Sequence, residues 1–149
     1  LRYGKICILA DADSDGLHIA TLLCALFLQH YKPLVQEGRI YVSMPPLYRI
    51  DCAKEVFYAL DDSQRDTIVK DLKSRKGKPK INIQRFKGLG EMNPSQLRET
   101  VMDPATRQLV SLTISPNDNA NSVMDLLLAK KRAPDRKEWL EKKGSLAKV

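Results

Sequence analysis

The first 43 residues contain a strand–helix–strand pattern, which constrains the fold more than any other part of the chain. Residues 6–10 (ICILA) form a continuous apolar run without alternation, which is typical of a strand buried on both faces in a parallel sheet. A mostly apolar segment over 17–32 predicts a helix that ends at Pro33, and 39–43 predicts the next strand. Because parallel strands need a crossover connection, we expect a right-handed β–α–β unit and therefore an α/β fold.

The chain changes character after this unit. We expect short strands over 47–50 and 55–60 and a charged helix over 62–73. A basic segment without acidic residues follows over 73–87, and 107–115 predicts another strand. Asn93 and Pro94 predict the start of a helix after the basic segment, and Ser122 predicts the cap of the first C-terminal helix.

These elements predict one domain with an insertion. A parallel-sheet core is expected from about 1–50 and about 107–149, including the C-terminal helices, and a smaller, irregular basic insertion from about 51–106. The length of 149 residues suits a single core.

Composition narrows the class of protein. The net charge of +7 favours a polyanionic partner such as nucleic acid, although charge alone is weak support. The longest apolar stretch, 19–28, is too short to span a membrane. The three cysteines have no metal-type spacing, and two of them lie in apolar runs. We therefore expect free thiols in a cytoplasmic protein.

Three carboxylates stand at alternate positions after the first predicted strand, as Asp11, Asp13 and Asp15, followed by Gly16. This spacing also opens the calcium loop of helix–loop–helix proteins. That loop needs a bidentate Glu at its twelfth position and a helix before it. Here the twelfth position is Leu22 and a strand precedes the loop, so a calcium site of this type is excluded.

Two interpretations of the acidic cluster remain. Asp13 or Asp15 could cap the following helix without any metal. One Asp would suffice for capping, however, and three carboxylates within five residues repel one another unless a cation neutralises them. Asp11 follows a predicted parallel strand at its carboxyl end, where ligand sites of open α/β sheets lie. Carboxylates there suit Mg²⁺, which commonly takes one or two of them together with water and phosphate oxygens.

Several cationic or titratable side chains could contact a phosphate. His18 lies on the first turns of the predicted helix, beside the carboxylates. Arg85 and Lys87 end the basic segment just before a glycine turn, and Arg132 and Arg136 lie in the C-terminal helices. Contacts to phosphates would position a nucleic acid without reading its sequence.

Five motifs carry a resemblance to a known family: DADSDGLHI, PPLYRI, QRFKGLGEMNP, LRETVMDP and LLLAKKR. In this order they resemble the C-terminal part of the ATPase subunit of bacterial type IIA DNA topoisomerases, over essentially all of these residues. QRFKGLGEMNP is the most specific of them. Ser14 and Leu17 resemble the B subunit of topoisomerase IV more than that of gyrase, which usually has Val and Ser at these places.

The resemblance implies a TOPRIM domain, a Rossmann-like parallel sheet flanked by helices, in which Mg²⁺ assists cleavage and religation of DNA. Mn²⁺ or Ca²⁺ could substitute for it. By the match, Asp11 is the catalytic residue and touches both metal positions, Asp13 binds the second, and Asp15 completes the motif. His18 and Arg136 match DNA-contacting residues, and Lys87 lies near the interface with the partner subunit on the DNA side.

The resemblance also implies partners and missing parts. The partners are double-stranded DNA and the A subunit of topoisomerase IV, which carries the nucleophilic tyrosine. The full enzyme would be an A2B2 heterotetramer that decatenates and relaxes DNA. It would act at the nucleoid in the bacterial cytoplasm. The family's upstream EGDSA motif, which supplies a glutamate ligand, and its ATP-binding domain do not occur in these residues. We therefore expect this chain alone to be inactive and ATP to bind only in an upstream domain.

Three alternatives stay open. The chain could belong to the B subunit of gyrase instead. It could be a DNA-binding or subunit-docking module without metal chemistry. It could also be a stand-alone phosphatase or nuclease that uses the Asp triplet.

Overall fold

Two small sheets organise the chain, which the computed structural model describes over residues 1–75, 80–115 and 119–146. The first sheet has the strand order β1-β2-β6, formed by Ile6–Ile8, Ile40–Ser43 and Leu109–Ser111. β1 and β2 are parallel, so the predicted β–α–β unit is confirmed. β6 is antiparallel to β2, and the expected parallel arrangement therefore holds for one pair of strands only.

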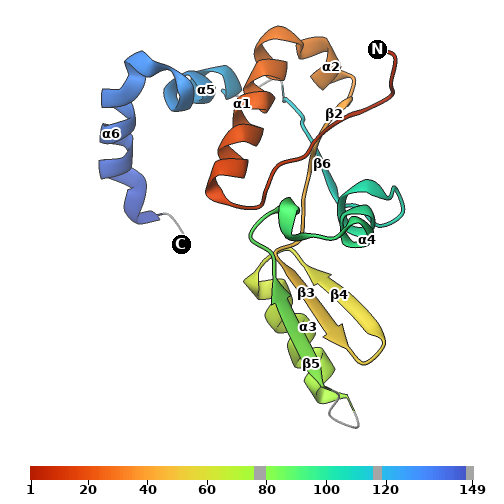
Figure 1. The fold of residues 1–149 in the computed structure, drawn as a ribbon. Helices are drawn as coiled ribbons and strands as arrows, with labels where there is room; N and C mark the ends of the chain where they lie inside the picture. Colours follow the sequence, from red (N-terminus) through yellow and green to blue (C-terminus); the bar gives the residue numbers. More distant parts are fainter. Residues whose placement is uncertain (76–79, 116–118, 147–149) are drawn as a thin grey trace.

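Helix α1 (Ser14–His30) connects β1 to β2 and covers the first sheet (Figure 1). Its buried residues Ala20, Cys24 and Leu28 pack in one core cluster with Ile8 and Ile40. This spacing of four residues is one face of a helix, and it explains why the apolar segment folds as it does.

The helix ends earlier than Pro33 indicated. α1 stops at His30 with Tyr31 as its C-cap. A short second helix, α2 (Lys32–Gln36), then begins with Pro33 in its first turn. Proline is tolerated there because the first turn needs no backbone N–H donor, so Pro33 starts a helix instead of ending one.

The second sheet has the order β4-β3-β5 and is antiparallel throughout. Its strands are β3 (Tyr48–Cys52), β4 (Glu55–Ala59) and β5 (Ile81–Arg85), and α3 (Asp62–Ser74) covers one face (Figure 1). Ile50 and Cys52 alternate inward and pack with Leu72 of α3 in a second core cluster. This part of the chain is more regular than the expected irregular insertion, because the basic segment contains β5.

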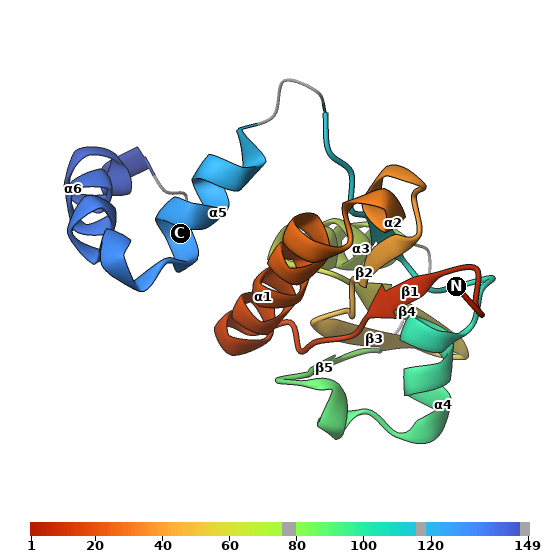
Figure 2. The same ribbon diagram turned by 90° about the horizontal axis from the view of Figure 1, so that it is seen from above.

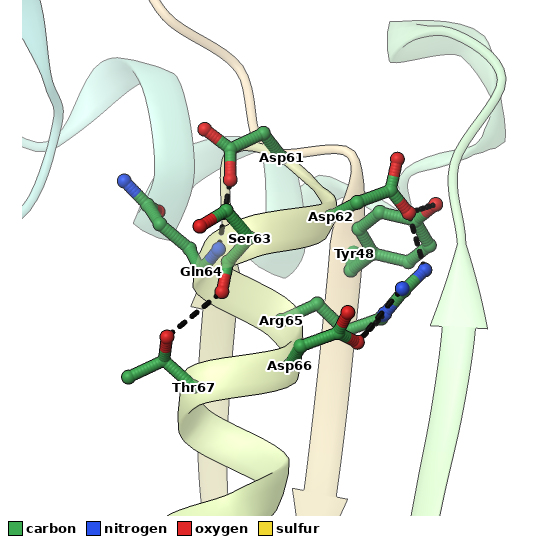
Figure 3. A network of polar contacts seen from close by, with 8 residues as sticks. All are labelled: Tyr48, Asp61, Asp62, Ser63, Gln64, Arg65, Asp66 and Thr67. Carbon is green, nitrogen blue, oxygen red and sulfur yellow. Dashed lines mark hydrogen bonds and ion pairs between the residues drawn. The ribbon is translucent and has the colours of Figure 1, made fainter.

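A polar network ties the start of α3 to this sheet (Figure 3). The Tyr48 hydroxyl donates to Asp62 Oδ1 at 2.8 Å, and the Arg65 guanidinium pairs with Asp62 and lies over the Tyr48 ring. The hydrogen bond from Tyr48 is the largest cause that lowers the pKa of Asp62. Asp61 caps α3 by accepting from the Gln64 backbone N–H at 2.8 Å.

The chain returns from the second sheet through a series of short helical turns. These are η1 (Leu89–Glu91), α4 (Pro94–Leu97) and a π-helical turn, η2 (Arg98–Met102). Asn93 caps α4 in a reciprocal capping box with Gln96, which confirms the cap predicted from Asn93 and Pro94.

Two helices follow β6, namely α5 (Ala120–Leu128) and α6 (Ala133–Lys143), and a short turn, η3 (Lys130–Arg132), joins them. Met124 of α5 packs against the core cluster under α1. The predicted cap at Ser122 is wrong, because α5 begins at Ala120 and its N-cap position is Asn119, three residues before Ser122. A turn of 3₁₀ helix, η4 (Gly144–Leu146), ends the described residues, among which no helix is both long and apolar enough to cross a membrane.

Candidate functional site

The acidic loop leaves the carboxyl end of β1 and turns directly into α1. Asp13 is the N-cap of α1, and its Oδ1 accepts from the Gly16 backbone N–H at 2.7 Å. A Cβ at Gly16 would lie 2.1 Å from the Asp11 carbonyl oxygen, so only glycine permits this turn. The capping interpretation is therefore correct for Asp13, while Asp15 lies in the first turn of α1.

A segment distant in the sequence, residues 87–91, contacts the acidic loop at Asp11. The Leu89 backbone N–H donates to Asp11 Oδ1 at 2.7 Å across 78 residues of chain. Beside it, a Cβ on Gly88 would lie 3.0 Å from Asp11 Cγ and both carboxylate oxygens. The Lys87 backbone N–H donates to Glu91 Oε2 at 2.9 Å and closes this turn. We call residues 87–91 the glycine turn.

The loop and the glycine turn together line a cleft of about 400 Å³. Its lining residues are Leu9, Ala10, Asp11, Asp13, Asp15, Gly16, Ile19 and Leu89. The three predicted carboxylates thus share one hollow at the end of β1.

The donor set of this cleft fits Mg²⁺ in part. In the described chain, Asp11 and Asp13 each make one hydrogen bond through Oδ1, which leaves Oδ2 available to a cation. Mg²⁺ commonly takes only one or two carboxylates and keeps several waters, so two such oxygens suit it. Between residues 1 and 146, leaving out 76–79 and 116–118, no three His, Cys, Asp or Glu side chains lie close enough to hold a metal by themselves. Asp15 lines the same cleft from the first turn of α1, and its part in metal binding stays a prediction.

The predicted phosphate-contacting residues fall into two groups. His18 is exposed on α1, and Arg85 and Lys87 are exposed where β5 runs into the glycine turn. The Arg85 guanidinium lies 6.0 Å from the centre of the Tyr48 ring. All three side chains are exposed and therefore accessible to a polyanion.

Arg132 and Arg136 are already engaged within the C-terminal helices. Arg132 pairs with Asp125 at 3.0 Å and with Asp135. Arg136 donates to the carbonyl oxygens of Leu126 at 3.0 Å and Ala129 at 2.8 Å. Neither arginine is among the residues that line the acidic cleft. Figures 1 and 2 also place α6, which carries Arg136, away from the glycine turn.

Sequence reasoning missed three members of this site. The Leu89 N–H donates to Asp11, Gly88 passes close to the Asp11 carboxylate, and Glu91 accepts from the Lys87 N–H within the same turn. A backbone donor leaves no mark in the sequence, because every residue except proline carries one. The one available signal was the motif KGLGE itself, with two glycines in five residues.

Comparisons with known proteins agree with one another. The family model described as "DNA gyrase B subunit, carboxyl terminus" matches residues 78–141. The B subunit of DNA topoisomerase 4 from Pseudomonas aeruginosa is 65% identical over 149 residues, covering all of this chain and 24% of that protein. The same protein of Haemophilus influenzae is 68% identical over 148 residues, covering 97% of this chain and 23% of that protein.

More distant matches point the same way. The B subunit of DNA gyrase from Thermotoga maritima is 43% identical over 142 residues, covering 95% of this chain and 22% of that protein. The crystal structure of the Plasmodium falciparum topoisomerase II DNA-binding, cleavage and re-ligation domain superposes with a TM-score of 0.74 at 23% identity. The superposition covers 94% of this chain and 18% of the Plasmodium falciparum chain, and it shows that the two share a fold.

The chain spans about a quarter of the length of the curated relatives it matches. At 60–68% identity to several topoisomerase 4 B subunits over nearly all its residues, it belongs to the family of bacterial type II DNA topoisomerase B subunits, with those of DNA topoisomerase 4 and DNA gyrase among its relatives.

Proposed function

We propose that this chain is the metal-binding and DNA-contacting part of a topoisomerase IV B subunit, with a TOPRIM domain as its core. In the complete enzyme it would support cleavage and religation of double-stranded DNA by a tyrosine of the A subunit. The observation that carries the proposal is the placement of Asp11 and Asp13 in one cleft at the carboxyl end of β1, each with one carboxylate oxygen left for a cation.

Each side chain has a distinct role in this proposal. Asp11 and Asp13 would hold Mg²⁺ through Oδ2, while Oδ1 of each keeps the loop in shape. Bound there, Mg²⁺ would supply positive charge to a phosphodiester oxygen. His18, Arg85 and Lys87 would hold the DNA backbone on the exposed surface around the cleft. The amino acids that complete the metal shell would come from outside this chain.

The wider setting follows from the relatives and is part of the proposal. The complete protein would assemble as A2B2, hydrolyse ATP in another of its domains, and act on chromosomal DNA in the bacterial cytoplasm. This chain alone would neither cleave DNA nor hydrolyse ATP. The identities of 65% to a topoisomerase IV protein and 43% to a gyrase protein favour decatenation over supercoiling.

The decisive experiment uses Asp11→Asn in the complete two-subunit enzyme. Asn keeps an oxygen that accepts from the Leu89 N–H but removes the negative charge. We expect Mg²⁺-dependent DNA cleavage to fall about 100-fold or more, because a bound metal contributes several kcal/mol at the reacting phosphate. Asp61→Asn is the matched control, since Asp61 also accepts from a backbone N–H but lies at the start of α3.

Two results would contradict the proposal. Cleavage by Asp11→Asn at the wild-type rate, with DNA binding intact, would favour a DNA-binding or docking module without metal chemistry. Robust DNA hydrolysis by the isolated chain would favour a stand-alone nuclease.

A further inference from the structure

We propose that the glycine turn is a positioning device for Asp11 and that Glu91 is the positioning residue that holds it closed. The inference rests on the proposed function, since it assigns a role in metal binding to a residue that does not itself line the cleft.

The first step is the contact between the turn and Asp11. The Leu89 N–H donates to Oδ1 at 2.7 Å, a short, charge-assisted hydrogen bond. Because one oxygen is held by this donor, the rotation of the carboxylate is fixed and Oδ2 is the oxygen left for a cation. The donor is a backbone group, so its position depends only on the path of the turn.

The second step is the close approach of the turn. Gly88 passes so near to Asp11 that a Cβ would lie 3.0 Å from three atoms of the carboxyl group. Few real Cβ contacts are that short, so the turn and the carboxylate could not keep this arrangement with a larger residue at position 88. The segment therefore fits against Asp11 as a backbone surface.

The third step is what keeps the turn in this path. Its ends are anchored by buried residues, Phe86 at 1% exposure and Met92 at 9%. Between these anchors the chain is largely exposed, and the Glu91 carboxylate accepts from the Lys87 N–H at 2.9 Å. Backbone bonds from Glu91 to Gly88 and from Met92 to Leu89, both at 3.1 Å, complete the turn.

Glu91 thus joins the first residue of the glycine turn to the last. Loss of its carboxylate would free the Lys87 N–H and widen the conformations of Gly88 and Leu89. Asp11 would then rotate more freely, and its affinity for a cation would fall because the carboxylate is no longer preorganised.

The test compares Glu91→Ala with Glu91→Gln in the complete two-subunit enzyme. Gln retains a side-chain oxygen that can accept from the Lys87 N–H, whereas Ala does not. We expect Glu91→Ala to raise the Mg²⁺ concentration for half-maximal DNA cleavage about 3- to 10-fold, the range for one lost hydrogen bond, and Glu91→Gln to restore it.

A second readout does not depend on activity. In the complete enzyme without metal, amide hydrogen exchange of the peptide that contains Leu89 should be about 3- to 10-fold faster in Glu91→Ala and near wild-type in Glu91→Gln. Glu99→Ala is the matched control, because Glu99 lies in the same return segment but bonds Tyr58 outside the turn.

The inference fails if Glu91→Ala changes neither the exchange of this peptide nor the Mg²⁺ dependence. It also fails if cleavage falls without a shift in Mg²⁺ dependence and Gln gives no rescue, which would indicate a general loss of structure. Failure of this inference is distinguishable from failure of the proposed function. If only this inference fails, Asp11→Asn still lowers cleavage about 100-fold or more, whereas failure of the proposed function leaves cleavage by Asp11→Asn at the wild-type rate.

Discussion

Asp13 has two roles in this account, and they can be separated by two substitutions at the same position. Its Oδ1 caps α1 by accepting from the Gly16 N–H, and its Oδ2 is assigned to the metal. Asp13→Asn keeps the capping oxygen and removes the charge, since Asn is as good an N-cap as Asp. Asp13→Ala removes both.

The expected effect on stability follows from the cap. Loss of an N-cap costs about 1 kcal/mol, and loss of a negative charge at the helix N-terminus costs about 0.5 kcal/mol for an exposed side chain. Asp13→Ala should therefore destabilise the chain by about 1.5 kcal/mol and Asp13→Asn by about 0.5 kcal/mol. For a protein of this size, these values correspond to decreases in Tm of about 3–6 °C and about 1–2 °C.

Two assays are needed. Thermal unfolding is monitored by circular dichroism, and Mg²⁺-dependent DNA cleavage is measured with the complete enzyme. Both variants should lose cleavage, whereas only Asp13→Ala should lose most of the stability. Asp61→Ala provides the control, because it removes an equivalent cap from α3 and should lower Tm while cleavage persists. Wild-type cleavage by Asp13→Asn would refute the metal role, and an unchanged Tm in Asp13→Ala would refute the capping role.

Three further outcomes are expected. Arg136→Ala should increase hydrogen exchange in α6 by removing two hydrogen bonds to carbonyl oxygens of the α5 end, and lowered DNA affinity with unchanged exchange would contradict this. Lys87→Ala should reduce the slope of log DNA affinity against log salt by about 0.9, as expected for one lost phosphate contact, and an unchanged slope would exclude that contact. Tyr48→Phe should lower Tm at neutral pH, because the Tyr48 hydroxyl depresses the pKa of Asp62 below its usual 3.8. That stabilisation is present above about pH 4 and is lost as pH falls through the folded-state pKa of Asp62. The difference in Tm between the wild type and Tyr48→Phe should therefore shrink in acid, and a difference that stays the same below about pH 4 would refute this explanation.

Local patterns predicted the local elements. The apolar run before Asp11 and the apolar helix after it were sufficient for the β–α–β unit, because burial on both faces leaves a strong signal. β5 was missed because Ile81 and Ile83 alternate with exposed polar residues inside a basic segment, and most of this strand is exposed. The direction of β6 depends on a connection through the whole second sheet, which periodicity does not encode.

The site was predicted only where a side chain carries the chemistry. Asp11 and Asp13 stood out by charge and spacing, whereas the Leu89 amide has no such mark. Arg136 illustrates a different limit, since its guanidinium donates to carbonyl oxygens at the end of α5 and a guanidinium suits a phosphate equally well, so its DNA contact stays a prediction. The sequence could not distinguish these two uses.

The contact between Asp11 and Leu89 also has a consequence for the order of folding. β1 and β2 come together across 34 residues, whereas this contact closes a loop of 78 residues that contains the entire second sheet. Longer loops have a higher closure entropy, and contacts of high sequence separation tend to form late. The cleft is therefore expected to be among the last parts of the chain to assemble. Transient unfolding of the second sheet alone would release Asp11 while the core under α1 persists, so the site would be lost before the first sheet is.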